Sequence, residues 1–234
     1  GLEKITKKDK KINLAFQNQK IIDAKRRYIQ FKKNIRNKRI LDYGCGFGEF
    51  LKESKQVSNF VYGYENDILR VDKLKKDKKI KLVEDLSVYK KHFDYIFLFH
   101  VFEHLSNPAE ILKNLKKTLR KNGKIILEVP NSNDLLISLP ELKEFKKFTF
   151  WSGHLILYNE KFIKKFLNKI GFKFVKVHHY QRYNFQNHLG WFLFKKPGGH
   201  NYFKQYYENN FDNSYKEYLC RTKKSDTIIV EIKI

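Results

Sequence analysis

Short apolar segments alternate with amphipathic segments through the first 130 residues of the chain. The apolar segments predict strands at residues 39–43, 60–64, 80–83, 94–99 and 124–129. The amphipathic segments predict helices over residues 47–54, 67–76 and 107–120, the last of them closed by Gly123. Each predicted strand is short and apolar, as burial on both faces requires. The alternation therefore predicts an α/β fold, a mostly parallel sheet with helices on both faces.

The pattern becomes less regular after residue 130. Residues 130–150 predict a loop with some helical character, residues 159–170 a helix closed by Gly171, and residues 172–179 and 226–234 the last two strands. Residues 181–225 form an insert between these two strands and carry twelve aromatic residues. Connections of that length in a compact domain are usually lids or binding loops. We interpret the insert as a substrate cap, with an oligomer contact such as a homodimer as the alternative.

Residues 1–38 predict a helical region at the start of a single domain that spans residues 1–234. Residues 1–39 hold fourteen Lys or Arg against three acidic residues. Apolar residues are interleaved as in an amphipathic helix packed on a core, namely Ile12, Phe16, Ile21, Ile22, Ala24, Tyr28, Ile29 and Phe31. Solvated helix faces therefore account for most of this local charge.

A glycine loop follows the first predicted strand. Gly44, Gly46 and Gly48 are spaced as G-x-G-x-G, one residue shorter than the G-x-G-x-x-G that binds a dinucleotide pyrophosphate. Asp42 stands just before the loop, and Glu65 ends the next predicted strand. A carboxylate at that position suits the two hydroxyls of a ribose. The loop and its two carboxylates predict a nucleoside-containing cofactor other than a dinucleotide.

This pairing resembles motifs I and II of the class I S-adenosylmethionine (SAM) dependent methyltransferases. The resemblance implies a Rossmann-like class I methyltransferase fold, with strands in the order 3-2-1-4-5-7-6 and strand 7 antiparallel. It also implies SAM as cofactor and S-adenosylhomocysteine as product. The implied cofactor-binding residues are Asp42, Tyr43, Gly44, Cys45, Gly46, Gly48, Glu65, Asn66, Asp85, Leu86, Phe99 and His100.

By the same resemblance, the glycine loop holds the methionine part of the cofactor and Asp42 acts on its amino group. Asp85 hydrogen-bonds the adenine amino group, and Leu86 donates its backbone N–H. Phe99 and His100 flank the methionine moiety.

Residues 93–105 are similar to motif IV of small-molecule methyltransferases, in which a strand ends at a Glu-His-Leu turn. His104 in this turn and His154 in the later Trp-Ser-Gly-His-Leu segment are both candidates for the catalytic base, because an imidazole suits proton removal from a hydroxyl. The alternative is that Glu103 and His104 only cap and orient the next helix.

Residues 181–191 and 196–200 look like a segment of methyltransferases from cell-surface polysaccharide gene clusters. The resemblance implies O-methylation of a sugar, a nucleotide-linked sugar or a phosphorylated precursor of a capsule or lipopolysaccharide. The residues predicted to bind this small-molecule substrate are Asn131, Arg182, Tyr183, Asn187, His188, Trp191 and His200. They combine a guanidinium fork for phosphate or carboxylate, aromatic rings for stacking and polar groups for hydroxyls.

The formal net charge of +24 opens a second reading, an RNA methyltransferase. The lysines are spread along the chain instead of forming a stripe, and the Asn/Asp-Pro-Pro-Tyr/Phe segment typical of methyltransferases acting on nucleic-acid amino groups is missing. Nucleic acid is therefore the less favoured partner. A third reading, a SAM fold that serves as a binding scaffold without catalysis, is disfavoured by the intact loop and carboxylates.

Cysteine and histidine usage set further expectations. Two cysteines, Cys45 and Cys220, give no disulfide framework, which favours the cytoplasm. No apolar run approaches the length of a membrane span, the first residues lack a secretory signal, and without Met residue 1 is not a translated start. We expect no metal, because the clustered histidines 178, 179, 188 and 200 lack carboxylate spacing.

Overall fold

The computed structural model describes residues 7–234, with side chains described from residue 18 onward except that of Phe174. Its first half contains α1 (Lys7–Ile35), β1 (Arg39–Tyr43), α2 (Glu49–Ser54), β2 (Phe60–Tyr64), α3 (Ile68–Leu74), β3 (Ile80–Leu82), the 3-10 helix η1 (Leu86–Val88) and β4 (Phe93–Phe99). The rest contains η2 (Phe102–His104), α4 (Pro108–Thr118), β5 (Leu119–Pro130), α5 (Leu135–Ser138), α6 (Lys143–Thr149), α7 (Glu160–Lys169), β6 (Phe174–Tyr180), α8 (Phe185–Phe194), α9 (Gly199–Tyr202), η3 (Lys204–Tyr206), α10 (Asn209–Arg221) and β7 (Thr227–Lys233).

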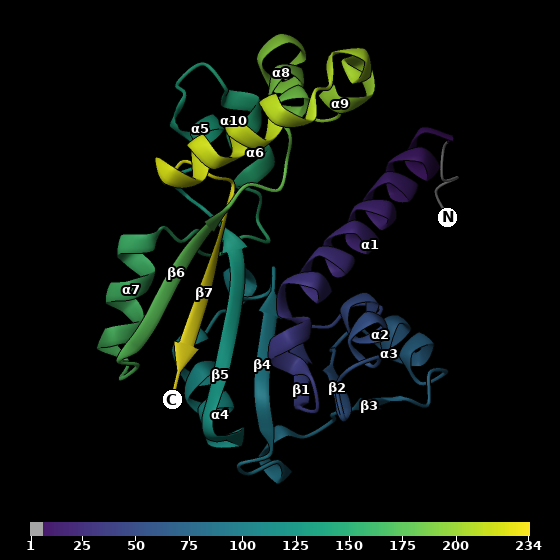
Figure 1. The fold of residues 1–234 in the computed structure, drawn as a ribbon, viewed down its shortest axis with the longest axis vertical. Coiled ribbons are helices and arrows are strands. Elements are labelled where there is room, and N and C mark those ends of the chain that lie inside the picture. Colours follow the sequence, from purple (N-terminus) through teal and green to yellow (C-terminus); the bar gives the residue numbers. More distant parts are fainter. Residues whose placement is uncertain (1–6) are drawn as a thin grey trace. The chain divides into compact units, whose positions relative to one another are not determined.

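The strands form one seven-stranded sheet in the order β3-β2-β1-β4-β5-β7-β6 (Figure 1). β1 is parallel to β2 and β4, and β2 is parallel to β3. β7 is antiparallel to both β5 and β6. The inner strands are buried on both faces, as with Ile40 and Leu41 of β1. The predicted α/β class, strand order and antiparallel last strand are confirmed.

The chain divides into two compact units, Gly1–Phe97 with Asn114–Gly123 and Leu98–Lys113 with Lys124–Ile234. The first unit has an aromatic core in which the Phe97 ring lies 5.3 Å from that of Phe31 on α1 and 4.9 Å from that of Phe50 on α2. This core fixes α2, the helix that follows the glycine loop, against the central strands.

α1 extends over most of the predicted helical region, and residues 1–6 lie outside the described residues. Ala24 and Phe31 are buried as expected. In contrast, Ile21, Ile22 and Ile29 are exposed, so the prediction that all the interleaved apolar residues pack on a core is wrong for these three. They lie off the stripe of α1 that faces its own unit. Ile12 and Phe16 lie outside the described side chains.

The helix predicted over residues 107–120 ends earlier, and Gly123 does not close it. α4 ends at Thr118, and β5 already begins at Leu119. The carbonyl of Thr118 accepts the N–H of His92, and that of Lys117 accepts the N–H of Lys91. These contacts with the segment before β4 satisfy the last carbonyls of the helix, so no glycine cap is needed.

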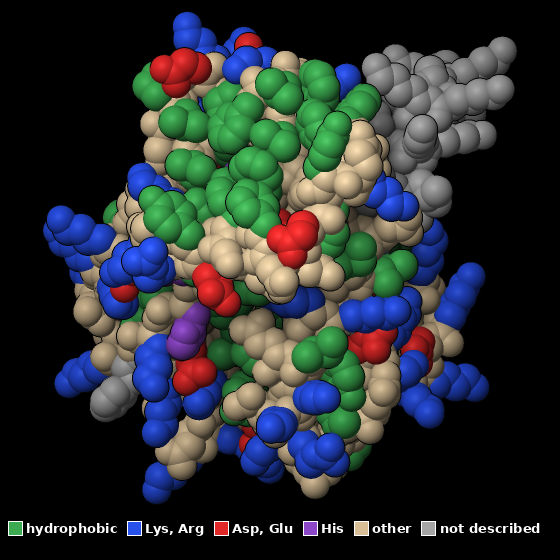
Figure 2. Space-filling view, turned by 45° about the horizontal axis from the view of Figure 1, so that its top comes forward, with side chains coloured by type: hydrophobic (Ala, Val, Ile, Leu, Met, Phe, Trp, Pro, Cys, Tyr) green, Lys and Arg blue, Asp and Glu red, His purple; other side chains and the backbone are tan. Residues whose placement is uncertain are grey.

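In the second unit the insert folds mainly into helices, α8, α9 and α10. Trp191 of α8 joins Leu136, Leu142 and Phe145 in a separate hydrophobic cluster that includes the two short helices of the region predicted as a partly helical loop. Figure 2 shows hydrophobic side chains gathered over the upper face of this unit. The exposed hydrophobic residues of this unit include Phe148, Phe150, Trp151, Leu193, Phe194 and Tyr202. Among the described residues, no helix combines the length and apolarity needed to cross a membrane.

Candidate functional site

The glycine loop after β1 requires glycine at its strained positions. Gly44, Gly46 and Gly48 have φ of 78°, 60° and 73°, in the left-handed region that favours glycine. A Cβ on Gly48 would lie 2.6 Å from Cδ2 of Leu74 and 3.2 Å from Cδ1 of Ile80. The G-x-G-x-G pattern therefore encodes both a tight backbone path and close packing on α3 and β3.

The loop is tied to the end of β2. The N–H groups of Gly44 and Cys45 both donate to the carbonyl of Tyr64, at 2.7 and 3.1 Å. The N–H of Gly46 donates to Oε2 of Glu65 at 2.8 Å. Oε1 of Glu65 accepts the N–H groups of the two following residues, each at 3.0 Å. Oε2 also lies 3.7 Å from a guanidinium nitrogen of Arg70, so a ribose hydroxyl bound there would share this oxygen with Arg70.

Asp42 is the next-to-last residue of β1, just before the loop. Its side chain is buried, and its Oδ1 has no hydrogen-bond partner. Burial raises the pKa of Asp42 to about 7, and the nearby positive charge of Arg27 lowers it in part. A buried carboxylate oxygen without a partner fits the ammonium group of a methionine moiety, which would supply both a donor and a positive charge. This orphaned oxygen is the structural support for the predicted cofactor.

The other predicted cofactor residues of the first unit divide into buried and exposed groups. The Tyr43 ring stacks on that of Tyr64 at 4.6 Å, and burial raises the pKa of Tyr43 to about 12. Burial also raises the pKa of Cys45, which keeps it a thiol and makes it a packing residue. Asn66 and Asp85 are exposed, and Asp85 caps η1 by accepting the N–H and the hydroxyl of Ser87. Leu86, partly exposed, begins η1.

In the second unit, Phe99 is buried at the end of β4 and His100 follows it with a φ of 53°. His100 Nδ1 lies 3.2 Å from Oε1 of Glu103, and its Nε2 lies 3.4 Å from Oε1 of Glu128. An Arg182 guanidinium nitrogen lies 3.1 Å from the same Nε2. Burial and the Arg182 charge lower the pKa of His100, but its bonds to Glu103 and Glu128 outweigh them and raise that pKa above its ordinary value. The structure thus brings together His100, predicted for cofactor, and Arg182, predicted for substrate.

The two candidate bases also meet. The rings of His104 and His154 lie 5.0 Å apart. Nδ1 of His104 bonds the carbonyl of Gly153, and Nδ1 of His154 lies 2.7 Å from the carbonyl of Thr149. A carbonyl only accepts, so each Nδ1 carries a proton and each Nε2 is the basic nitrogen. Burial lowers the pKa of His154, which keeps that imidazole neutral at neutral pH.

Glu103 completes this cluster. One ligand atom from each of Glu103, His104 and His154 lies within 4.8 Å of the others. The prediction of no metal considered only histidines 178, 179, 188 and 200 and overlooked this group. The sequence does contain one signal for it, because Glu103 adjoins His104 directly at the end of a buried strand.

Three of the predicted substrate residues pack inside the insert. Asn187, His188 and Trp191 are buried. His188 Nδ1 lies 2.8 Å from the Tyr215 hydroxyl, and its Nε2 lies 3.2 Å from Nε2 of Gln181. The Trp191 indole meets the ring of Phe145 edge-on at 4.9 Å. These contacts give each of the rings a structural partner.

The remaining predicted substrate residues are more accessible, apart from Asn131. Arg182 places its guanidinium 5.2 Å from the Tyr183 ring centroid, and both backbone N–H groups donate to Asp226. His200 is exposed on α9. Asn131 is buried, and its amide donates to the carbonyl of Ser225 at 2.8 Å.

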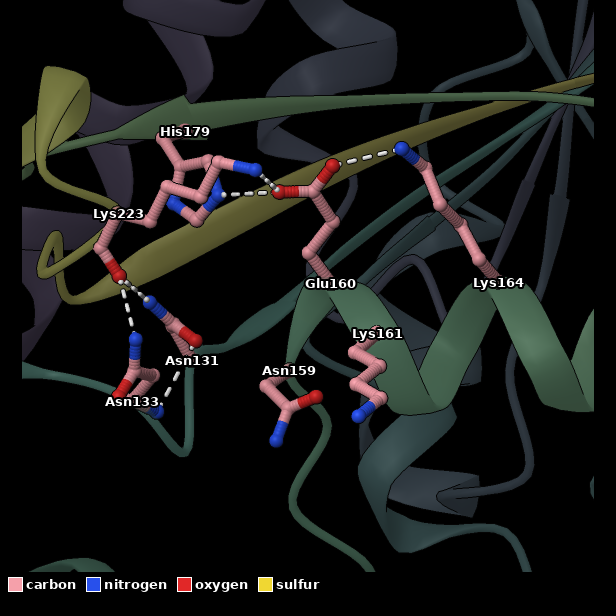
Figure 3. Close-up of a pocket in the computed structure, with 8 residues that line it drawn as sticks. All are labelled: Asn131, Asn133, Asn159, Glu160, Lys161, Lys164, His179 and Lys223. Carbon is pink, nitrogen blue, oxygen red and sulfur yellow. Dashed lines mark hydrogen bonds and ion pairs between the residues drawn. The ribbon is translucent and has the colours of Figure 1, made fainter.

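Asn131 also lines a pocket of about 410 Å³ in the second unit (Figure 3). The lining residues are Asn131, Asn133, Asn159, Glu160, Lys161, Lys164, His179 and Lys223. Glu160 accepts from Lys164 at 2.6 Å and from Lys223 at 2.8 Å, and lies 3.3 Å from His179. These contacts lower the pKa of Glu160 to about 2, and the two lysines contribute more to that shift than His179 does. The lining carries more positive than negative charge.

Two acidic residues of the second unit that contact predicted site residues were not themselves predicted from the sequence. Glu128 is fully buried within β5, where it faces His100, and Asp226 holds the backbone of Arg182 and Tyr183. Glu128 had a readable signal, since it is the single charge in the apolar run of residues 125–130 that ends β5. Asp226 had none, because an acidic residue before a strand is ordinary loop chemistry.

Comparison with known proteins adds a family and a fold. Residues 14–177 match a family model described as a methyltransferase domain. The chain is 27% identical over 157 residues to a tRNA U34 carboxymethyltransferase of Nautilia profundicola, covering 61% of this chain and 50% of that protein. It is 24% identical over 115 residues to a ubiquinone biosynthesis O-methyltransferase of Yersinia pestis, covering 45% and 48%. The matches thus span about half the length of these two curated relatives.

A solved structure extends the likeness over nearly the whole chain. The crystal structure of a SAM dependent methyltransferase from Archaeoglobus fulgidus superposes with a TM-score of 0.59 at 18% identity. The match covers 92% of this chain and 94% of that one. At that identity the likeness concerns the fold alone.

Proposed function

Because the chain belongs to the methyltransferase domain family, we propose that it transfers the methyl group of SAM to a hydroxyl of a small acceptor. The family and the fold confirm the prediction of a class I SAM-dependent methyltransferase. The observation that supports SAM as the methyl donor is the glycine loop, which is hydrogen-bonded to Glu65. Asp42, just before the loop, adds a buried Oδ1 without a hydrogen-bond partner. The identity of the acceptor and the roles of single residues are the proposed part.

The reaction needs an in-line displacement and the loss of one proton. An acceptor oxygen forms a bond to the methyl carbon as the C–S bond breaks, and sulfur keeps the electron pair, which leaves a neutral thioether. The hydroxyl proton leaves at the cluster of His104 and His154, where each Nδ1 donates to a backbone carbonyl and each Nε2 is the basic nitrogen. Holding the acceptor in line and removing its proton are the tasks of the protein, since SAM supplies the electrophile.

We assign the acceptor to sugars, nucleotide-linked sugars or phosphorylated precursors of a cell-surface polysaccharide. The pocket that contains Asn131 supports this class, because its lining carries three lysines against the single carboxylate of Glu160, and this positive balance suits a phosphate. Arg182 offers a second phosphate contact, and the helical insert acts as the cap. Two free cysteines support a cytoplasmic reaction.

RNA is the second candidate acceptor, favoured by the net charge of +24 and by the likeness to the tRNA U34 carboxymethyltransferase. A radiolabelled SAM assay against nucleotide sugars, sugar phosphates and total RNA separates the two. Label in a sugar fraction supports the proposal, and label in RNA alone replaces it. Calorimetry that finds no binding of SAM or S-adenosylhomocysteine would instead favour the non-catalytic scaffold.

A pair of variants on α7 tests the pocket. Lys161 lines it and Lys165 does not. Lys161→Met is expected to raise KM for a phosphorylated acceptor by about 10-fold, the size of one charge-assisted hydrogen bond, with little change in kcat. Lys165→Met removes the same charge from the same helix and controls for it. Equal effects of the two variants would contradict a phosphate role for the pocket.

A further inference from the structure

Three side chains of types that bind metals meet after β4. One ligand atom from each of Glu103, His104 and His154 lies within 4.8 Å of the others. Two imidazoles and a carboxylate are a ligand set of catalytic zinc sites, which keep a fourth position for water or substrate. We propose that these three residues bind one divalent transition-metal ion, with Zn²⁺ as the ion that the ligand set fits.

Both imidazoles present the nitrogen that a metal needs. The carbonyl of Gly153 accepts from Nδ1 of His104, and that of Thr149 accepts from Nδ1 of His154. These bonds fix the proton on Nδ1 and leave the Nε2 lone pair for a metal. Metal-binding histidines usually donate their second ring N–H to a backbone carbonyl or a carboxylate in this way.

Glu103 provides the independent sign of a ligand. Its side chain is fully buried, and its Oε2 has no hydrogen-bond partner, whereas Oε1 faces His100 Nδ1 at 3.2 Å. A buried carboxylate oxygen without a partner is destabilising unless a cation or donor meets it. Oε1 also lies 4.0 Å from Nε2 of His104, so the carboxylate borders the imidazoles, and a metal ion bound by this carboxylate supplies the missing positive charge.

The backbone holds the two halves of the cluster together. Glu103 and His104 lie in η2, and the carbonyl of Glu103 accepts the N–H groups of Leu155 and Ile156 at 2.9 and 3.2 Å. The segment that carries His154 is therefore fixed to the turn that carries the other two residues. Tetrahedral zinc ligands lie about 3.3 Å apart, so rotation of the side chains completes the site.

The use of the ion rests on the proposed function. The His104 side chain is 34% exposed, which leaves the cluster open to an acceptor. A cation there lowers the pKa of an acceptor hydroxyl, and the proton passes to water instead of to an imidazole. The oxygen then forms its bond to the methyl carbon as the C–S bond breaks. With the ion bound, His104 and His154 serve as its ligands, and the ion instead of an imidazole activates the acceptor hydroxyl.

Zinc binding is measured directly, without an acceptor. Protein stripped with a chelator is dialysed against Zn²⁺, and bound metal is counted by elemental analysis. We expect one Zn²⁺ per chain. His104→Ala, His154→Ala and Glu103→Gln should each weaken binding by more than about 100-fold, because loss of an outer partner alone costs about 10- to 100-fold. His178→Ala, at an exposed position of β6, should bind as the wild type does.

Trp151 gives a second readout inside the site. Its ring lies 5.8 Å from that of His104 and 5.4 Å from that of His154. Zn²⁺ should change the indole fluorescence, and Trp151→Phe should abolish the change while keeping one Zn²⁺ per chain. Trp191, the other tryptophan of the sequence, remains as the unresponsive background.

Circular dichroism of each stripped variant checks folding. If Glu103→Gln unfolds, the test rests on His104→Ala and His154→Ala, which change partly exposed side chains. Binding below one equivalent, or equal binding by His104→Ala and His178→Ala, would overturn the site. Methyl transfer that survives chelation with no zinc bound overturns the metal and keeps the methyltransferase. One tightly bound Zn²⁺ supports the site even where no acceptor is methylated, a result that counts against the proposed function alone.

Discussion

The carboxylate of Glu65 accepts the backbone N–H of Gly46, with 2.8 Å between Oε2 and the nitrogen. This bond joins the end of β2 to the glycine loop after β1. Together with the N–H groups of Asn66 and Asp67, it fixes the carboxylate through three backbone donors. Glu65 therefore orders the loop as well as offering an oxygen to the ribose.

Replacing Glu65 by Gln should weaken cofactor binding through both roles. Hydrogen bonds to charged groups contribute about 1.5–3 kcal/mol, so the Kd for S-adenosylhomocysteine should rise by about 10- to 100-fold. Isothermal titration calorimetry measures it. Glu53→Gln, which removes a carboxylate from α2, is the control and should leave the Kd unchanged. Unchanged affinity in Glu65→Gln would exclude Glu65 from the cofactor site.

The packing of Gly48 yields a stability prediction. Gly48→Ala adds strain at a φ of 73° and brings a Cβ to 2.6 Å from Leu74, so unfolding free energy should fall by about 2–4 kcal/mol. Gly171→Ala is a matched control, since its φ is 92° and nothing lies within 4 Å of its Cβ. That variant should lose only about 1 kcal/mol. Equal losses in urea unfolding would show that the contact with Leu74 relaxes at no cost.

The sheet could be predicted from the sequence because its strands are short apolar runs between amphipathic segments, a pattern typical of strands buried on both faces. The order of the strands came from the resemblance, since periodicity alone does not fix which strands are neighbours. The end of α4 was missed for a tertiary reason. The carbonyls of Lys117 and Thr118 bond the residues before β4, and no local glycine or proline marks that exchange.

The cofactor loop could be predicted because its chemistry is local, with three glycines and a carboxylate within the seven residues 42–48. The contacts inside the insert could not be predicted in this way. His188 and Trp191 have side chains typical of sugar contacts, yet they also contact Tyr215 and Phe145 on other helices. The meeting of His104 and His154 was equally hidden, because it depends on backbone bonds between segments some fifty residues apart.

Asp42 should make stability depend on pH. Burial raises its pKa in the folded protein from 3.8 to about 7. Between these values the folded state binds the proton more strongly than the unfolded state does, so stability falls as the pH rises from about 4 to about 7. The contribution is on the order of a few kcal/mol. Asp42→Asn keeps the shape without the charge and should be more stable than the wild type at pH 8.

The comparison at pH 5 is the control for Asp42→Asn. There the Asp42 carboxyl is largely protonated, so the difference in unfolding free energy between variant and wild type should shrink. Urea unfolding at both pH values measures it. The same variant should bind S-adenosylhomocysteine at least about 10-fold more weakly, because the ammonium group loses its counter-charge. A pH-independent difference would show that Asp42 titrates near its ordinary value in the folded protein.

The buried His188 should stabilise the fold through its bond to Tyr215, and the variant Tyr215→Phe tests this role. The Tyr215 hydroxyl lies 2.8 Å from His188 Nδ1, so Tyr215→Phe leaves a buried ring nitrogen without its partner. That change should cost about 1–3 kcal/mol of unfolding free energy. Tyr218→Phe removes a hydroxyl from an exposed ring of the same helix and should cost less than about 0.5 kcal/mol. If Tyr215→Phe instead keeps full stability and raises KM for the acceptor, the hydroxyl and His188 belong to the substrate site as the sequence predicted.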